Sequence, residues 1–569
     1  MKFWRSGLLA VGAAVVLSAQ EKTTFSVPMR DGVRLATDVY GADTKVPKPV
    51  LLQRTPYNKD NSAAVARRYA AAGYVSVVQD ARGAFASQGQ YFHHNNDDQD
   101  GYDTIEWLTH QPWSNGKVGM WGGSHPGAVQ WLAAADRPPG LVVLAPTAAS
   151  PSLYYTAYVG GALRLALIGG AGPLITKPPS GKSVPPNLIE FYRTLPLTRL
   201  DEAIGWEMPW MRGVLEHPWL DGFWSRQHAT ERTRGLDIAA QHIVGYYDFL
   251  CRETVASFQR MRKDSASKKS RHAQQLILGP WDHSTGRTTV LTGSEPDFGK
   301  EAALDVVEEN RQWFDRFLKD SGNSMDFPPV RYFVLGRNEW RKAGNWPPPE
   351  SVDRSLYLRS SGNANTRAGD GRLSGTPQAK SSIAEFIVDP ADSVPADPPG
   401  VSPMPRSSMF RPIDRRRIQD RPDVLVYTAA PQTQELIVAG NPRAELYASV
   451  DVEDADFAVK LLDVTPNGPA YPVAEGVLRL THREGDLRPS RVVPGKVYRI
   501  TVDLGHTAFA LAPGHALQLE IAGSYFPVYD RNSHTEEGSF ARTERSAKQR
   551  IHHSPAYPSR LILPVLRTR

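Results

Sequence analysis

The first 150 residues alternate between short apolar runs and longer segments of mixed polarity. The apolar runs predict buried strands at 50–54, 75–79, 118–121 and 141–145, after a two-stranded segment at 24–40. The segments between them predict helices at 61–72, 103–108 and 127–135. Strands that alternate with helices are typical of a mostly parallel sheet covered on both faces.

The pattern changes near residue 150. Up to about residue 236 the chain has glycine and proline clusters and scattered aromatic residues but no strand–helix alternation, which predicts an inserted helical segment. The sheet resumes with strands at 241–245 and 276–278 and a closing helix at 309–318. From about residue 355, apolar and polar positions alternate, which indicates an antiparallel sandwich of jelly-roll type.

The N-terminus has the pattern of a secretory signal. Lys2 and Arg5 precede an uncharged apolar run at 7–17, and Leu17-Ser18-Ala19 offers a cleavage point before Gln20 or Glu21. The run is too short to span a bilayer, although a retained apolar anchor remains the alternative. No cysteine lies near the cleavage point, so lipid attachment there is excluded. We expect a periplasmic or secreted protein without membrane insertion after signal removal.

Composition excludes some classes of function. The 569 residues carry a formal charge of only +6, too dilute for a nucleic-acid-binding surface. The densest basic run, Arg415-Arg416-Arg417, is flanked by Asp414 and Asp420 and is expected to be a solvated loop. Cys251 is the single cysteine, so no intrachain disulfide forms and the fold must depend on buried cores.

Ser124 lies in a glycine-rich turn between a predicted buried strand and an alanine-rich helix. This is the context of a nucleophile elbow, in which small residues surround a serine held in a sharp turn. Gly122 stands two residues before the serine, but Pro126 takes the place where the common motif has glycine, and glycine follows at Gly127. The alternative, that Ser124 only caps the helix, is the weaker interpretation.

A nucleophilic serine needs a base, and the base needs an orienting carboxylate. In this type of fold the chain order is serine, acid, histidine, each after a sheet strand. Asp248 follows the strand at 241–245 and His283 follows the strand at 276–278, so we assign them as acid and base. Asp282 is the rival acid, but a residue adjacent to the histidine rarely reaches its Nδ1.

The predicted fold class is therefore α/β: an α/β-hydrolase core with an inserted helical cap and a C-terminal jelly-roll β-sandwich. The expected division of the chain is a signal peptide at 1–20, a first part of the core at 21–149, the cap at 150–236, a second part of the core at 237–350 and the sandwich at 351–569.

The tetrahedral intermediate of acyl transfer needs fixed donors for its oxyanion. The first donor is expected to be the backbone N–H of His125, directly after the nucleophile. The second must come from the loop after the strand at 50–54, which lacks a glycine-rich segment. The Tyr57 phenol is a candidate, which the residues alone leave open.

Motifs along nearly the whole chain resemble the family of cocaine esterase, the α-amino acid ester hydrolases and the X-Pro dipeptidyl peptidases. They are Arg30-Asp31-Gly32-Val33-Arg34-Leu35, Pro56-Tyr57, Asp80-Ala81-Arg82-Gly83, Gly101-Tyr102-Asp103, Gly122-x-Ser124 with Gly127, Gly245-x-Tyr247-Asp248, Gly279-Pro280-Trp281-x-His283 and Ser524-x-Phe526-Pro527. The resemblance implies that glycine comes three residues after the nucleophile. It also implies that the Tyr57 hydroxyl is the second oxyanion donor.

Two departures from the family bear on the substrate. Members usually carry tyrosine directly after the nucleophile, where this chain has His125, whose side chain either shapes the acyl site or packs away from it. The α-amino acid ester hydrolases have acidic residues just beyond the triad acid that hold the substrate ammonium. Here no acid follows Asp248 until Glu253, which favours a neutral or anionic acyl group unless a cap carboxylate such as Glu216 or Asp221 compensates.

Two further groups are candidates for the site. Phe249 and Trp281 could line the acyl pocket. His93 and His94 suggest a metal site, but adjacent side chains do not easily converge on one ion. We therefore expect a surface loop leading into the following helix, with no metal and no cofactor.

Together these features predict a serine hydrolase that cleaves a small-molecule acyl ester, with an amide as the other possible substrate, through an acyl-enzyme on Ser124. The alternatives are an X-Pro dipeptidyl peptidase or an α-amino acid ester hydrolase and β-lactam acylase. A non-catalytic glycan- or partner-binding protein is more distant. The sequence gives no oligomeric state.

Overall fold

The structure is a computed structural model that describes residues 22–175, 183, 185–283, 296–319, 327–398 and 411–567. The expected signal peptide, and with it the expected export, lies outside the described residues. Among the helices that are described, none is both long and apolar enough to cross a membrane.

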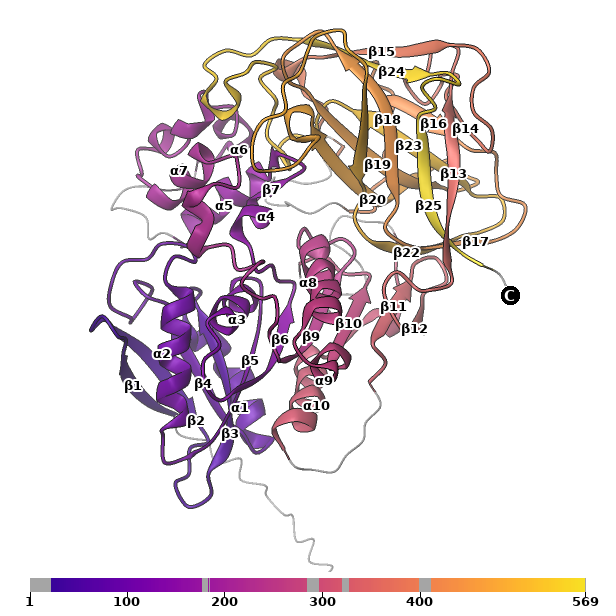
Figure 1. Cartoon of the computed structure of the whole chain (residues 1–569). Helices are drawn as coiled ribbons and strands as arrows, with labels where there is room; N and C mark the ends of the chain where they lie inside the picture. The colour runs from indigo at the N-terminus through magenta and orange to yellow at the C-terminus, as the bar shows by residue number, and fades with distance from the viewer. Residues whose placement is uncertain are drawn as a thin grey trace, which may run out of the picture.

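The N-terminal part is built on a ten-stranded sheet of order β1-β2-β4-β3-β5-β6-β9-β10-β11-β12 (Figure 1). The strands are β1 (Lys22–Pro28), β2 (Arg34–Tyr40), β3 (Lys48–Thr55), β4 (Val75–Asp80), β5 (Ser114–Gly123), β6 (Leu141–Thr147), β9 (Ala239–Gly245), β10 (Gln274–Gly279), β11 (Val330–Val334) and β12 (Glu339–Ala343). The strands from β4 to β11 run parallel, and β1, β2 and β12 are antiparallel at the edges. The inner strands β4, β9 and β10 are buried along their whole length, as expected for a sheet covered on both faces.

Helices cover both faces of this sheet. On one face, α2 (Asp97–Thr109), α3 (His125–Ala135) and α8 (Cys251–Asp264) share an apolar cluster with the strands. On the other, α1 (Ala63–Ala71) and α10 (Val306–Leu318) do the same. A short helix, α9 (Lys268–His272), leads into β10, and the 3-10 turns are η1 (Lys59–Ser62) and η5 (Lys300–Ala302). Every residue of α3 is buried, so the helix that begins at the serine turn is fixed inside the molecule.

The segment between β6 and β9 forms the helical cap. Its elements are α4 (Leu153–Ala157), β7 (Tyr158–Val159), β8 (Ala162–Leu163), α5 (Leu165–Ile175), α6 (Leu188–Phe191), η2 (Leu197–Arg199), η3 (Glu202–Ile204), α7 (Pro209–Glu216) and η4 (Gly222–Arg226). It has an apolar cluster of its own, which includes Tyr154, Trp206, Met211 and Trp224. Figure 1 shows the cap above the core and beside the C-terminal β domain.

The C-terminal domain is β-rich, and its strands belong to one thirteen-stranded sheet. They are β13 (Ser351–Arg359), β14 (Arg372–Ser374), β15 (Ser382–Val388), β16 (Leu425–Thr428), β17 (Leu436–Gly440), β18 (Arg443–Val450), β19 (Asp456–Val464), β20 (Ala470–Arg479), β21 (Tyr498–Asp503), β22 (Thr507–Leu511), β23 (Ala516–Ala522), β24 (Ala547–His553) and β25 (Arg560–Leu566). The remaining turns are η6 (Pro390–Asp392), η7 (Leu480–His482) and η8 (Gly538–Phe540). Strands such as β15, β21 and β24 alternate strictly between buried and less buried positions, as the period of two predicts.

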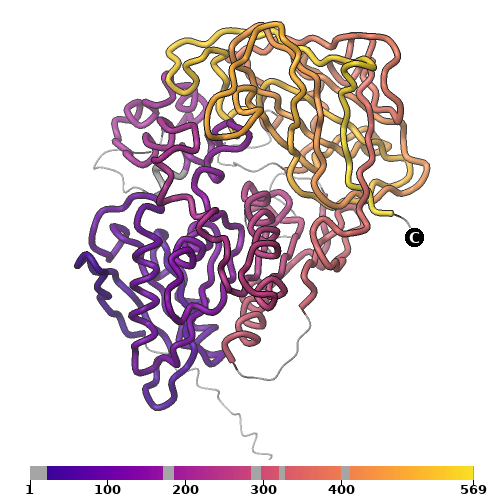
Figure 2. The backbone as a smooth tube through the Cα atoms, viewed as in Figure 1, coloured from indigo at the N-terminus to yellow at the C-terminus, as the bar shows by residue number. Residues whose placement is uncertain are grey.

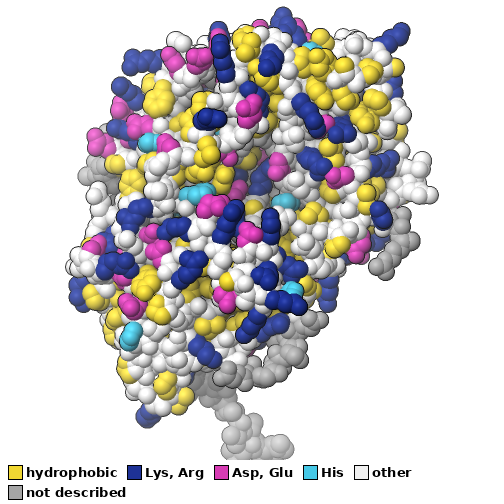
Figure 3. Space-filling view, in the orientation of Figure 1, with side chains coloured by type: hydrophobic (Ala, Val, Ile, Leu, Met, Phe, Trp, Pro, Cys, Tyr) yellow, Lys and Arg dark blue, Asp and Glu magenta, His cyan; other side chains and the backbone are white. Residues whose placement is uncertain are grey.

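One sequence expectation about charge is wrong. Arg415 was expected in a solvated loop, but its side chain is buried and its Nη2 lies 2.6 Å from Glu520 Oε1 on β23. A buried charge needs such a partner, because burial without one is costly. On the face of the molecule in Figure 3, basic and acidic side chains are intermixed rather than gathered into a patch of one sign.

Candidate functional site

The turn between β5 and α3 holds Ser124 in an unusual backbone conformation. Its φ is 63° and its ψ is −127°, a region that non-glycine residues rarely adopt. The Ser124 N–H donates to the carbonyl oxygens of Thr147 and Ala148 at 3.0 and 3.2 Å, which fixes the turn against the next strand. A strained serine between a buried strand and a buried helix is the geometry of a nucleophile elbow.

Two glycines allow this turn to close. A Cβ atom on Gly122 would lie 2.5 Å from the Cβ of Pro126, and one on Gly127 would lie 2.6 Å from the Cβ of Ala149. Neither contact is tolerable, so a glycine is needed three residues after the serine. The position that has no room for a side chain is therefore 127, and not 126, where the common motif has glycine and this chain has proline.

The parallel register brings the ends of four strands to one edge of the sheet. Gly123 of β5 pairs with Thr147 of β6, Thr147 with Ile243 of β9, and Gly245 of β9 with Gly279 of β10. Backbone hydrogen bonds extend the alignment beyond the strands, from Tyr246 N–H to the Gly279 oxygen at 2.9 Å and from Tyr247 N–H to the Trp281 oxygen at 3.0 Å. Ser124, Asp248 and His283 therefore all follow strand ends on the same side of the sheet.

Asp248 and His283 form a hydrogen-bonded pair. His283 Nδ1 lies 2.8 Å from Asp248 Oδ2, and the other carboxylate oxygen accepts from the Leu250 N–H at 2.8 Å. The Asp248 side chain is fully buried, whereas the imidazole remains 25% exposed. Burial alone would lower the pKa of His283, but the charge and hydrogen bond of Asp248 outweigh it and raise the pKa above 6.5. The carboxylate thus orients the ring and stabilises its protonated form.

Tyr57 projects from the loop after β3 toward the serine turn. Burial raises the pKa of its phenol, and hydrogen bonds with the Ser124 side chain and the His125 backbone N–H oppose that rise. Tyr57 nevertheless remains 41% exposed, so many protein atoms lie near its ring but part of the residue still faces solvent. The phenol is close to the Ser124 side chain and to the His125 N–H. A tetrahedral intermediate on Ser124 would require donors at such a place.

The two candidate pocket residues have different surroundings. The Phe249 ring lies 4.5 Å, centroid to centroid, from the His283 ring and so belongs to the site. The prediction that Trp281 lines the pocket is wrong. Its side chain is 0% exposed, packs with Ile243 and Ile277, and donates its indole N–H to the Ala302 oxygen at 2.7 Å. The position of Trp281 in the motif, two residues before His283, did not reveal that its side chain is buried in the core.

The His125 side chain is buried beside two other histidines, and its ring also lies 6.2 Å from that of Tyr57. Its ring stacks on that of His94 at 4.2 Å and lies 4.9 Å from that of His93. Burial lowers the pKa of His125 to about 4 and lowers that of His93 well below its ordinary value. The prediction of a surface loop here is wrong, because the cap covers His93 and His94 and both are buried. The adjacent pair of histidines was the only signal of this cluster in the sequence.

Charged residues that could reach a substrate are mostly engaged elsewhere. Arg252 turns toward the β domain, where Nη1 lies 2.6 Å from Asp503 Oδ1 and Nη2 donates to the Glu475 oxygen. In the cap, Asp221 pairs with His217 at 2.8 Å and caps η4, and Glu216 is exposed at the end of α7. Neither the cation nor the cap carboxylates considered from sequence are thus held at the catalytic pair.

Comparison with known proteins finds similarity over nearly the whole chain. A family model described as X-Pro dipeptidyl-peptidase (S15 family) matches residues 31–285. One described as X-Pro dipeptidyl-peptidase C-terminal non-catalytic domain matches residues 323–562. The chain is 35% identical to cocaine esterase of Rhodococcus sp. over 575 residues, covering 95% of this chain and 98% of that protein.

Two solved structures resemble this one throughout. An aminopeptidase from a marine sediment Thaumarchaeota archaeon superposes with a TM-score of 0.81 at 26% identity, covering 96% of this chain and 97% of the other. An α-amino acid ester hydrolase also superposes with a TM-score of 0.81 at 26% identity, covering 98% of each chain.

Proposed function

Because the chain belongs to the cocaine esterase family of serine hydrolases, we propose that it hydrolyses carboxylic esters through an acyl-enzyme on Ser124. Two observations carry this proposal: the Tyr57 phenol lies at the Ser124 turn, and the hydrogen-bonded Asp248–His283 pair follows strand ends on the same side of the sheet. A strained serine, a histidine and an orienting carboxylate are the groups that nucleophilic acyl transfer requires.

The reaction proceeds in two steps. His283, oriented by Asp248, takes the proton from the Ser124 hydroxyl as the oxygen attacks the ester carbonyl. The Tyr57 hydroxyl and the His125 N–H stabilise the oxyanion of the tetrahedral intermediate. The imidazolium then protonates the departing alcohol, and water, deprotonated by the same imidazole, releases the acid from Ser124. The raised pKa of His283 favours the imidazolium that forms in each step.

The acyl group that fits best is neutral. An acyl group with a buried ammonium would need a carboxylate partner, because an unpaired buried charge is costly. Asp248 is committed to His283, and the residues that follow it place no free acid beside the ring. The Phe249 ring, 4.5 Å from that of His283, instead offers an apolar contact. Arg252, a nearby positive charge that would suit an anionic acyl group, is engaged by Asp503.

A second candidate is cleavage of amino-acyl amides, as in an aminopeptidase or an X-Pro dipeptidyl peptidase. Its support is the similarity in structure to the archaeal aminopeptidase at a TM-score of 0.81. The two functions differ in the acyl part of the substrate, which is neutral in the first and carries an amino group in the second. Esters of neutral acids should be turned over faster than Xaa-Pro anilides or amino-acid esters if the first proposal holds.

The decisive experiment replaces the nucleophile. Ser124→Ala should abolish turnover of p-nitrophenyl esters and labelling by a fluorophosphonate probe, because the hydroxyl that forms the acyl-enzyme is gone. Ser76→Ala is the matched control, since that buried serine lies in β4, away from the site, and its hydroxyl has no hydrogen-bond partner among the described residues. Full turnover by a purified, folded Ser124→Ala protein would reject the proposal.

A further inference from the structure

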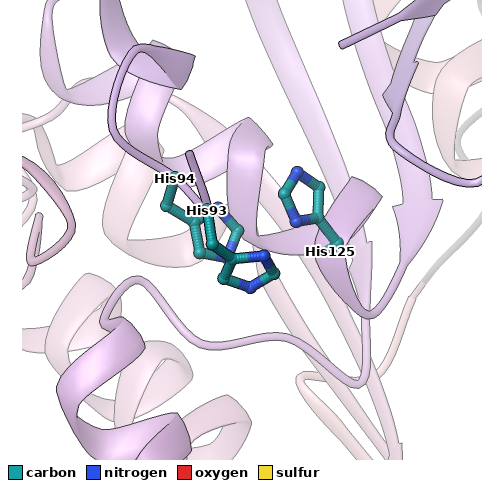
Figure 4. A group of neighbouring side chains, drawn as sticks. All are labelled: His93, His94 and His125. Atoms are coloured by element: carbon teal, nitrogen blue, oxygen red, sulfur yellow. The ribbon is translucent and has the colours of Figure 1, made fainter. Parts of the chain in front are cut away.

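Three imidazole rings form one buried cluster beside the serine turn. His93 and His94 come from the loop between β4 and α2, and His125 is the first residue of α3 (Figure 4). The three side chains each offer one nitrogen such that all of these atoms lie within 4.8 Å of one another. The residues are only 9%, 5% and 4% exposed. Histidines that meet in this way, from two separate segments, have the chemistry of a transition-metal site.

Several of these nitrogens lack a hydrogen bond among the described residues. His94 Nδ1 and both ring nitrogens of His125 are buried and form no hydrogen bond within the part of the chain that the structure describes. Buried polar atoms are nearly always satisfied, so each exception requires an explanation. A metal ion that accepts their lone pairs supplies one. The His125 ring extends from the first turn of α3 toward the other two rings (Figure 4).

A carboxylate completes the set of donors. Asp97 Oδ2 lies 3.4 Å from His94 Nδ1 and 3.4 Å from His125 Nε2, so it faces both rings. Its other oxygen, Oδ1, lies 3.1 Å from Arg54 Nη1, which holds the carboxylate in place. Arg54 brings a positive charge near the cluster, and Asp100, 3.7 Å from Arg54 Nη2, offsets part of it.

The outer contacts also suit a metal site. The Tyr91 hydroxyl lies 2.7 Å from His93 Nδ1, which leaves Nε2 as the free ligand atom. Ligand histidines commonly use their second nitrogen in such a bond, which fixes the ring and its tautomer. From the cap, Trp210 stacks on the His93 ring at 5.2 Å and Gln227 Nε2 donates to the His93 carbonyl at 3.1 Å. The cluster is therefore closed on the cap side.

We propose that His93, His94, His125 and Asp97 form a structural Zn²⁺ site. Three imidazoles and one carboxylate make a closed four-coordinate set, with no position left for a substrate. Zinc–nitrogen bonds are about 2.0–2.1 Å long. The ion therefore has to draw the three nitrogens together from within 4.8 Å of one another, turn the nearly parallel His94 and His125 rings, and bring Asp97 toward them. The ion lies beneath the cap and joins the loop before α2 to the first residue of α3. This site does not depend on the proposed ester hydrolysis.

Cobalt titration of the full-length protein tests the proposal. The protein is produced without a polyhistidine tag, stripped with a strong chelator, and titrated with Co²⁺ alone. The expected result is one Co²⁺ per chain with the intense visible absorption of tetrahedral Co²⁺, lost when Zn²⁺ is added. Zn²⁺ should also raise the melting temperature of the stripped protein. Binding of clearly less than one ion per chain, or only octahedral Co²⁺ spectra, would overturn the proposal.

Variants locate the ion. Loss of outer-shell partners alone costs about 10- to 100-fold in metal affinity, so loss of a ligand in His94→Leu should weaken Co²⁺ binding at least about 100-fold. His125→Phe is the second variant, because family members carry an aromatic ring at that position and the protein should fold. His242→Gln changes a buried histidine on β9, outside the cluster, and should bind Co²⁺ like the parent. Ser124→Ala should also bind Co²⁺ normally, which separates this site from the fate of the proposed reaction. Equal binding by His94→Leu or by His125→Phe and the parent would refute the assignment.

Discussion

In the proposed mechanism, stabilisation of the oxyanion depends most directly on Tyr57. Its phenol meets the Ser124 side chain and the His125 N–H, and only its hydroxyl distinguishes it from phenylalanine. Tyr57→Phe should therefore keep the fold and the ring packing but lower kcat for p-nitrophenyl esters about 100- to 1000-fold, the usual cost of one lost oxyanion donor. The measurement is steady-state kinetics with one ester.

Tyr40→Phe is the matched control for that measurement. The Tyr40 hydroxyl is buried in the core without a hydrogen-bond partner among the described residues, so its loss should leave kcat unchanged. If both variants retained the parental kcat, Tyr57 would have no part in the oxyanion site.

The sequence located the strand-end residues well, for a physical reason. In a parallel sheet the residues after successive strands meet at one edge, so Asp248 and His283 could be placed together from strand positions alone. The part of Tyr57 came only from the resemblance to a family. His93 and Trp281 were misplaced because their burial depends on the cap and on packing between loops, which no local pattern records.

At the level of elements, helix α2 shows where periodicity fails. The apolar pattern predicted a helix at 103–108, but α2 begins at Asp97. Its first turn contains Asp97, Asp98 and Asp100. None of them is apolar, so the apolar pattern missed this turn, but negative side chains are favourable near the positive N-terminal end of a helix. All three are buried and pair with arginines from other segments, among them Arg54, Arg82 and Arg232. The start of the helix is thus set by tertiary ion pairs.

Helix α8 carries a carboxyl group whose burial makes stability depend on pH. Glu253 lines a cavity of about 600 Å³ between the cap, α8 and the β domain. Burial raises its pKa from 4.5 to about 7, against the opposing charges of Arg164, Arg252 and Arg260. A raised carboxyl pKa means that the folded state favours the neutral form. Its contribution to stability is complete below pH 4.5 and is lost as the pH rises toward 7.

Glu253→Gln keeps a neutral side chain at every pH. The variant should melt roughly 1–4 °C above the parent at pH 8, and the difference should shrink toward pH 5. Thermal unfolding followed by circular dichroism at both pH values measures it. Glu484→Gln is the control, because the Glu484 side chain is 72% exposed and should show no such trend. A difference that is the same at pH 5 and pH 8 would contradict the role given to Glu253.

At the level of the whole molecule, the cap, the core and the β domain hold one another in place. The cap is fixed to the β domain by backbone hydrogen bonds, from Ala166 N–H to the Pro527 oxygen at 3.0 Å and from Arg479 N–H to the Gly160 oxygen at 2.7 Å. Arg252, four residues after Asp248, donates to the Glu475 and Asp503 backbone oxygens of that domain. The backbone trace in Figure 2 shows the cap lying next to both the core and the β domain.

The β domain also completes the hydrophobic core of the catalytic part. One continuous cluster joins Val244 and Tyr246 near the Asp248 loop, Phe258 of α8, and strand residues of the β domain such as Leu504 and Leu563. A chain that ends at residue 348 would leave this apolar surface in water, and large exposed patches of this kind cause association. We expect the truncated chain to aggregate and to lack esterase activity. Size-exclusion chromatography with an ester assay measures both.

Co-production of residues 349–569 tests whether activity can be rescued, since covering the surface with a separate chain should restore soluble, active protein. A truncated chain that eluted as an active monomer would mean that the catalytic part folds independently, despite the shared core.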